Sequence, residues 1–198
     1  MIALNSGQYL TPEEYLEFEK TSEIRHEYVD GEIYAMSGAS NAHNIINLNV
    51  ASGLKSRLRG TTCRPYMNDM KVRVADGRRF FYPDLLVSCA LETNDLTTYY
   101  MEQPKVIIEV LSKSTEGFDR GDKFKFYRSI PSLQEYILVS TDQYSVDHFR
   151  RGENNFWVLQ SYQDLDAMLQ LKSINVEISL AEIYDTITFE APSETATD

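Results

Sequence analysis

The 198-residue sequence has few of the residues that build small metal-bound or disulfide-bound scaffolds. It contains two cysteines, three histidines and one tryptophan. Two cysteines are too few for a disulfide framework or a four-thiolate zinc site, and His26, His43 and His148 are too scattered to indicate zinc ligation. We therefore expect Cys63 and Cys89 to be packing residues of a reduced, cytoplasmic protein.

Long apolar runs and several common catalytic motifs are also missing. No stretch of about 18 apolar residues occurs, so we expect no membrane span and no membrane partner. Residues 1–8 lack the basic and apolar regions of a signal peptide. The sequence contains no G-x-x-x-x-G-K-[ST], G-x-G-x-x-G or G-x-S-x-G motif. These absences argue against a nucleotide-phosphate cradle and against a serine-hydrolase elbow.

The composition is that of an ordinary globular chain. Hydrophobic residues make up 42% and charged residues 25% of the sequence, and the length suits one domain with a core of its own. We find no internal repeat and no linker. Residues 1–187 are therefore expected to form a single domain, and residues 188–198, rich in Ser, Thr, Ala and acids, a disordered acidic tail.

Charge is unevenly distributed along the chain. The formal net charge is −11, which counts against a protein that coats nucleic acid by charge alone. Residues 41–80 nevertheless contain eight basic and two acidic residues. This basic strip is either a solvated helix face and hairpin tip or a local surface that faces phosphates. In the second case, Lys71 and Arg73 are candidates for binding the nucleic-acid backbone.

The order of the expected elements indicates an α/β fold, of the α+β-like kind with a mixed sheet flanked by helices. Thr11, Pro12 and Glu14 form the signature of a helix start with a capping box. Asp30-Gly31 between two strand-like runs predicts a hairpin. The elements expected after them are helices at 40–58 and 118–128, strands at 67–74, 79–88, 105–111, 135–140, 144–150 and 156–162, and a short turn of helix at 180–184.

Two acids lie inside apolar strands, where an ionised carboxylate is costly unless it is paired or binds a metal. Asp84 follows Pro83 in one expected strand, and Glu109 interrupts a run of valines and isoleucines in another. If adjacent strands bring the two acids together, a hard divalent cation such as Mg²⁺ would relieve their repulsion. The alternative is that each acid sits at an edge, where it reaches water or an arginine.

Four further residues are candidates for the same site. Lys123 and Tyr127 are four residues apart and share one helix face, so Lys123 could stabilise charge on a phosphate; most helix lysines are instead solvated. His43, at the start of an expected helix, is a candidate for substrate binding or a packing residue. Glu27 is either part of the site or a plain strand residue.

The motifs together resemble the Uma-type restriction-endonuclease-like family of bacterial proteins, within the PD-(D/E)XK nuclease superfamily. The resemblance covers about residues 11–184. The segments that carry it are 11–16, 26–40, His43, 69–72, 82–84, 108–112, 119–127 and 130–136.

The resemblance implies a restriction-endonuclease-like fold and a site that cleaves DNA with Mg²⁺ or Mn²⁺. Asp84 matches the motif aspartate, Glu109 the second acid and Glu27 an acid that often lines such sites. The metal would be held by Asp84 and Glu109, with help from the Val110 carbonyl. The superfamily lysine is expected two residues after the second acid, where this chain has Leu111.

Because of this departure, Lys123 on the following helix is our candidate for the missing lysine. The first hypothesis is thus a metal-dependent DNA endonuclease, expected to act as a homodimer because two-fold dimers commonly cut both strands. The second is a DNA-binding or assembly protein with a vestigial site on a nuclease scaffold. The third is a structural homodimer whose acidic surface serves a protein partner.

Overall fold

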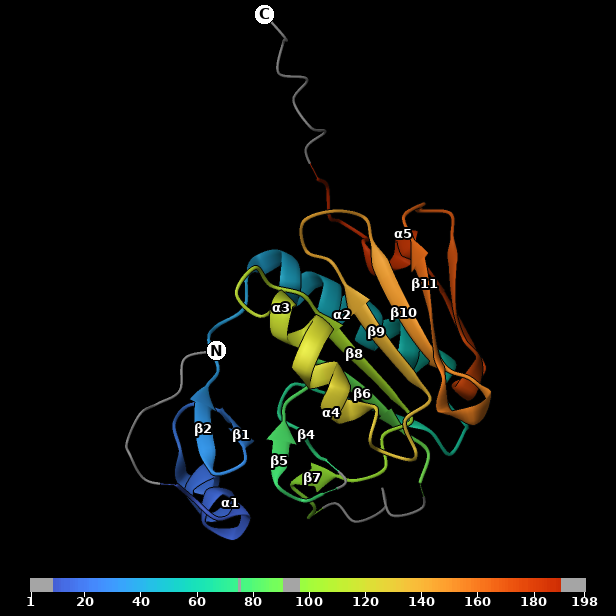
Figure 1. Ribbon diagram of the computed structural model, residues 1–198. Helices are drawn as coiled ribbons and strands as arrows, with labels where there is room; N and C mark the ends of the chain where they lie inside the picture. The colour runs from blue at the N-terminus through green and yellow to red at the C-terminus, as the bar shows by residue number, and fades with distance from the viewer. Residues whose placement is uncertain (1–8, 75, 91–96, 190–198) are drawn as a thin grey trace, which may run out of the picture.

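Two β-sheets of unequal size organise the chain (Figure 1). The computed structural model describes residues 9–74, 76–90 and 97–189. The larger sheet is mixed, because β8 and β9 run parallel while its other neighbours are antiparallel. In spatial order its six strands are β11 (Trp157–Tyr162), β10 (Val146–Arg151), β9 (Glu135–Val139), β8 (Val106–Val110), β6 (Leu85–Ser88) and β3 (Arg64–Met67).

The smaller sheet and the first helix form the N-terminal part of the molecule. In spatial order its strands are β2 (Glu32–Ala35), β1 (His26–Val29), β5 (Arg79–Phe81), β4 (Lys71–Arg73) and β7 (Tyr100–Met101). Helix α1 (Pro12–Thr21) begins with the expected capping box, in which Thr11 and Glu14 each accept a hydrogen bond from the other's backbone. The turn between β1 and β2 uses Asp30 and Gly31, both at positive φ, as the Asp-Gly signal predicts.

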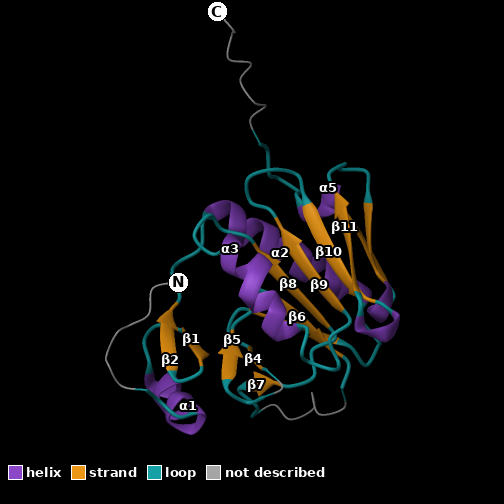
Figure 2. Cartoon of the chain, in the orientation of Figure 1, coloured by secondary structure: helices purple, strands orange, loops and turns teal. Residues whose placement is uncertain are grey.

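Helices cover both faces of the larger sheet (Figure 2). Helix α2 (Asn41–Arg57) starts at the N-cap Ser40 and packs Ile46, Val50 and Leu54 against one face. The opposite face is covered by one helical segment made of α3 (Glu116–Phe118), η2 (Asp119–Lys123) and α4 (Phe124–Tyr127). The expected mixed sheet flanked by helices is thus confirmed.

Two expected strands are each split by a bend that moves the chain from one sheet to the other. Residues 67–74 contain the end of β3 and all of β4, with Asn68 at positive φ between them. Residues 79–88 contain β5 and β6, separated by Tyr82, Pro83 and Asp84. Proline has no N–H for a sheet ladder, so the strand ends there. The second bend places Asp84 at the junction of the two sheets.

The segment 116–127 is helical as expected, but its middle turn is a π-helix, Asp119–Lys123. A single π-helical turn inside an α-helix is uncommon and is often found at functional sites. Both terminal residues of this turn are buried despite their charges. The wider turn therefore directs an acid and a lysine toward the sheet.

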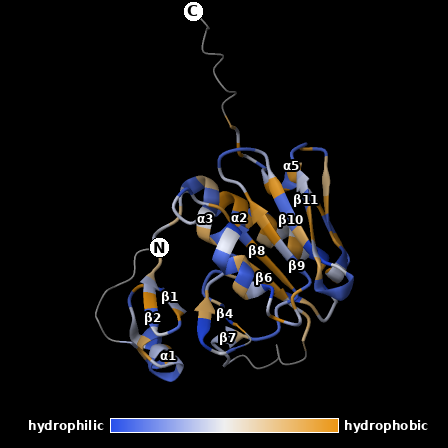
Figure 3. Cartoon of the chain, viewed as in Figure 1, coloured by the Kyte–Doolittle hydropathy of each residue, from blue (hydrophilic) through white to orange (hydrophobic). Residues whose placement is uncertain are grey.

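The C-terminal part adds a hairpin that the sequence patterns do not predict, before the short helix that they predict at 180–184. Strands β12 (Met168–Leu171) and β13 (Val176–Ser179) form a separate hairpin, and short helix α5 (Leu180–Ile183) follows it. They pack with α2 against the larger sheet and enlarge its core. Figure 3 shows the hydrophobic residues concentrated on the central strands of this sheet.

The expectation that both cysteines are simple packing residues is wrong. Cys63 and Cys89 form a disulfide bond. The antiparallel register of β3 and β6 pairs Arg64 with Ser88, so the two cysteines are the next opposed positions along the ladder. The sequence alone does not reveal this, because the register is set by the bends described above.

The C-terminal boundary also differs in detail from the expectation. Phe189 packs its ring against Tyr144 and Tyr184, so residues 188 and 189 still belong to the folded domain. The rest of the expected tail, residues 190–198, lies outside the described residues. In the described part of the chain, no helix has both the length and the apolar character needed to cross a membrane.

Candidate active site

The two strand acids meet at the end of the larger sheet. The Val110 N–H donates to Asp84 Oδ2 at 2.8 Å, and the Asp84 N–H donates to Glu109 Oε2 at 3.3 Å. These contacts follow from the pairing of Leu85 with Ile108 in adjacent strands β6 and β8. Each carboxylate therefore accepts a hydrogen bond from the backbone beside or at the other acid, which places Asp84 and Glu109 side by side in the structure.

Glu109 points away from α2 and into the interior beneath η2 and α4. Its side chain is almost fully buried, and the Tyr127 hydroxyl donates to its Oε1 at 3.2 Å. Burial raises the pKa of Glu109 well above its ordinary value; Lys123 opposes this rise, while Asp119, Asp84 and Glu27 add to it. The ionised form of Glu109 is therefore energetically unfavourable unless a cation lies beside it.

Lys123 supplies that cation. Its Nζ lies 3.0 Å from Glu109 Oε1, 3.0 Å from Glu27 Oε1 and 3.4 Å from Asp119 Oδ1. Burial lowers the pKa of Lys123, but the carboxylates and Tyr127 raise it by more, so the net shift is well upward. Lys123 is therefore a buried ammonium group in the site, and it is not a solvated helix lysine.

Glu27 reaches the site from the smaller sheet. It lies on β1, is 4% exposed, and accepts a hydrogen bond of 3.2 Å from the Tyr82 N–H through Oε1. The same oxygen contacts Lys123. Glu27 therefore lies in the same cluster as Lys123, and the cluster joins both sheets with the helix that lies between them.

His43 contacts Asp84 from the first turn of α2. Its Nε2 lies 3.2 Å from Asp84 Oδ1. Burial lowers the pKa of His43, but hydrogen bonding and charge from Asp84, together with the Val110 backbone, raise it by more. The net shift of the His43 pKa is therefore upward, and its imidazole lies in direct contact with the Asp84 carboxylate.

Asp119 is a member of the cluster that our sequence reasoning did not select. It is 4% exposed and precedes Lys123 by four residues. That spacing was a usable signal, since residues four apart on a helix are neighbours. The spacing alone does not place Asp119 in the cluster, because Asp119 belongs to a π-helical turn that the sequence does not indicate.

Lys71 and Arg73 take positions apart from this cluster. Lys71 Nζ donates to the Tyr82 hydroxyl, and Arg73 pairs with Glu102 and lies over the Tyr100 ring. Much of the basic strip is also neutralised within the protein: the strip residues Arg57, Arg73, Arg78 and Arg79 all form ion pairs with carboxylates. This pairing favours the structural interpretation for at least half of the strip.

The donor set suits a hard cation with few protein ligands. Within residues 9–74, 76–90 and 97–189, no group of three or more His, Cys, Asp or Glu side chains is arranged to hold a metal ion. What the site offers is two carboxylates, Asp84 and Glu109, and the Val110 carbonyl. Mg²⁺ typically takes one or two carboxylates and keeps several waters, so these residues fit it.

Comparisons with known proteins bear on the family of this chain. A family model described as Uma2, "Putative restriction endonuclease", matches residues 12–182. Two uncharacterized proteins of Synechocystis sp. are similar: one is 36% identical over 91% of this chain and 94% of its own, the other 31% identical over 89% of this chain and 100% of its own.

A solved structure from Anabaena variabilis, titled as that of "a putative nuclease belonging to DUF820", has the same fold. Its TM-score is 0.75 at 17% identity, over 90% of this chain and 99% of that chain. A likeness at this identity establishes the fold and not the activity. The family match spans nearly the whole domain and includes every residue of the cluster. The chain therefore belongs to the Uma2 family of restriction-endonuclease-like proteins.

Proposed function

We propose that this protein is a metal-dependent endonuclease that hydrolyses phosphodiester bonds of DNA. One observation carries the proposal: Asp84 and Glu109 are adjacent at the junction of the sheets, and the buried ammonium of Lys123 lies 3.0 Å from Glu109. Paired carboxylates with a lysine in contact suit phosphoryl chemistry, because negative charge develops on the phosphate oxygens in the transition state. Membership of the family supports the same reaction class.

The metal would be held by Asp84, Glu109 and the Val110 carbonyl, with Mg²⁺ or Mn²⁺ as the ion. When bound, such an ion polarises the phosphate and lowers the pKa of the attacking water. The hydrogen bonds from the Val110 N–H and from His43 fix the orientation of the Asp84 carboxylate. Partners of this kind position a metal ligand and adjust its basicity.

Lys123 replaces the lysine that the superfamily pattern expects on the strand. Its contacts with Glu27 and Asp119 hold the ammonium in place, and its raised pKa keeps it charged. We assign it the stabilisation of charge on the reacting phosphate. Tyr127 holds Glu109 through its hydroxyl, and His43, in contact with Asp84, is placed to contact the substrate.

A plasmid-nicking assay with Mg²⁺ and with Mn²⁺ tests the proposal. The parent should convert supercoiled DNA to nicked circles, and EDTA should abolish the reaction. Asp84→Asn and Glu109→Gln should each lower the rate by at least about a hundredfold, the scale of removing a major electrostatic contribution. The matched control is Glu177→Gln, an exposed acid on β13, which should nick like the parent.

The outcomes also separate the competing hypotheses. Salt-sensitive DNA association without nicking, unchanged in Asp84→Asn and Glu109→Gln, would identify a binding module. If the parent neither nicks DNA nor associates with it, the result would favour a protein-interaction role. Sedimentation of the parent with and without DNA measures whether the protein acts as the homodimer that double-strand cleavage calls for.

A further inference from the structure

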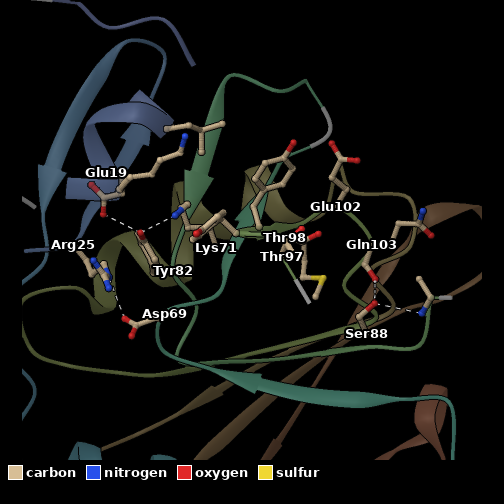
Figure 4. Close-up of a pocket in the computed structure, with 16 residues that line it drawn as sticks. Glu19, Arg25, Asp69, Lys71, Tyr82, Ser88, Thr97, Thr98, Glu102 and Gln103 are labelled. Atoms are coloured by element: carbon tan, nitrogen blue, oxygen red, sulfur yellow. Dashed lines mark hydrogen bonds and ion pairs between the residues drawn. The ribbon is translucent and has the colours of Figure 1, made fainter. Parts of the chain in front are cut away.

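A cavity lies on the α1 side of the smaller sheet (Figure 4). Its volume is about 650 Å³, which is in the range of small-molecule sites. Its lining includes Leu16, Lys20, Arg25, Lys71, Tyr82 and Tyr100. None of the six belongs to the acid and lysine cluster described above.

A buried lysine faces this cavity. Lys71 is 6% exposed, its Nζ donates to the Tyr82 hydroxyl at 3.1 Å, and the same ammonium lies 5.0 Å from the centre of the Tyr82 ring. Tyr82 in turn donates to Glu19 Oε1 at 2.9 Å. Glu19 also accepts from the His26 N–H at 2.9 Å and has its other oxygen 3.1 Å from His26 Nδ1. Lys71 is thus linked to the Glu19 carboxylate through the Tyr82 hydroxyl.

Among the described residues, no carboxylate makes direct contact with the Lys71 ammonium, although the charge of Glu19 acts on it. Of the other cations that line the cavity, Arg25 pairs with Asp69 at 3.2 Å and Lys20 pairs with Glu17 at 2.6 Å. Within the part of the chain that the structure describes, Lys71 forms no ion pair. Burial lowers the pKa of Lys71, and the charge of Arg25 lowers it further, against the opposing effects of Glu19 and Asp69. A buried cation of this kind is costly until an anion reaches it.

We propose that the cavity binds a phosphate-bearing ligand of nucleotide size, with its phosphate oxygens on Lys71 Nζ. An ammonium group has three N–H donors, and Tyr82 accepts only one of them. A phosphate supplies several acceptor oxygens together with the missing negative charge. Arg25 and Lys20 are already paired with carboxylates, so the phosphate would depend on Lys71, and Leu16 and Tyr100 offer apolar surface to a base or sugar.

The proposal does not depend on the cleavage reaction. The two sites meet only at Tyr82, whose backbone N–H binds Glu27 while its hydroxyl binds Lys71. Binding can therefore be measured in EDTA and in the Glu109→Gln variant, where cleavage is absent but the cavity is intact. Failure of the nuclease proposal would leave this measurement unaffected.

Isothermal titration calorimetry with 5′-dAMP in EDTA provides the test. We expect saturable one-to-one binding to the parent, at least tenfold weaker binding of deoxyadenosine, and at least tenfold weaker dAMP binding to Lys71→Met. The control is Lys55→Met, an exposed lysine on α2, which should bind like the parent. Absence of dAMP binding, or equal affinity in Lys71→Met and the parent, would overturn the proposal.

A second measurement uses the unmodified chain and so does not depend on how Lys71→Met folds. Amine acetylation followed by mass spectrometry should show Lys71 protected at least threefold by dAMP, with Lys55 unchanged. Equal protection of both lysines, or of neither, contradicts the proposal. Competition by a 5′-phosphorylated hexanucleotide, but not by its unphosphorylated form, would identify a strand end as the source of the phosphate. Competition by neither would identify a free nucleotide.

Discussion

Replacing Lys123 with methionine should destabilise the protein strongly. The ammonium contacts carboxylates of Glu27, Glu109 and Asp119, and all four side chains are almost completely buried. Removing one partner of a buried ion pair costs about 3 to 5 kcal/mol, because the other charge remains without compensation. For a domain of this size the melting temperature should fall by roughly 10 °C.

The effect should depend on pH in a defined direction. A carboxyl whose folded pKa is raised, as that of Glu109 is, favours folding most below its unfolded pKa, and this stability is lost as the pH rises through the folded pKa. Lys123 opposes the rise, so the variant should lose more stability than the parent as the pH increases. The difference between them should be larger at pH 8 than at pH 5.

Urea unfolding in a double-mutant cycle measures the interaction directly. Glu109→Gln removes one of the charges that Lys123 compensates, so Lys123→Met should cost about 2 kcal/mol less in that background. Lys125→Met, a neighbouring helix lysine that is exposed, serves as the control and should change stability little. A loss below about 1 kcal/mol for Lys123→Met, or additive effects in the cycle, would refute the reasoning.

Three further predictions concern separate contacts. Tyr127→Phe removes the hydroxyl that donates to Glu109 and should cost about 1 to 3 kcal/mol in urea unfolding, since a buried acceptor loses its partner; an unchanged midpoint would contradict this. Reducing the Cys63–Cys89 bond, which closes a loop of 26 residues, should lower stability by about 3 kcal/mol, and a mass increase of two hydrogens on reduction checks that the bond exists. Thr11→Ala removes the side-chain half of the α1 capping box and should lower the free energy of unfolding by about 1 kcal/mol, with Thr21→Ala at the other end of the helix as a comparison.

Local signals in the sequence were sufficient for the elements with strong caps and turns. The Thr11 capping box and the Asp30-Gly31 turn each specify backbone geometry within a few residues, and the structure confirms both. The convergence of Asp84 and Glu109 was also predictable, because charged residues inside apolar strands need a partner. The capping box and the turn required no knowledge of distant parts of the chain, whereas the meeting of the two acids depends on the pairing of β6 with β8.

The remaining features depend on tertiary context. The bends at Asn68 and Pro83 move strands between two sheets, and only the finished register brings Cys63 opposite Cys89. The four-residue strands β12 and β13 are too short for their alternation to stand out in the sequence. The burial of Asp119 depends on the π-helical turn, whose stability comes from what packs around it.

The placement of Lys123 on a helix has a consequence for how this site tolerates change elsewhere. A lysine two positions after Glu109 would be fixed by the covalent geometry of the strand, whereas Lys123 reaches Glu109 only while its helix keeps its position on the sheet. That position is set by aromatic packing: the ring of Phe124, the next residue, stacks on Tyr136 and contacts Phe149 and Trp157. Substitutions among these rings, which never touch the acids, should therefore shift the ammonium group and alter the chemistry from a distance.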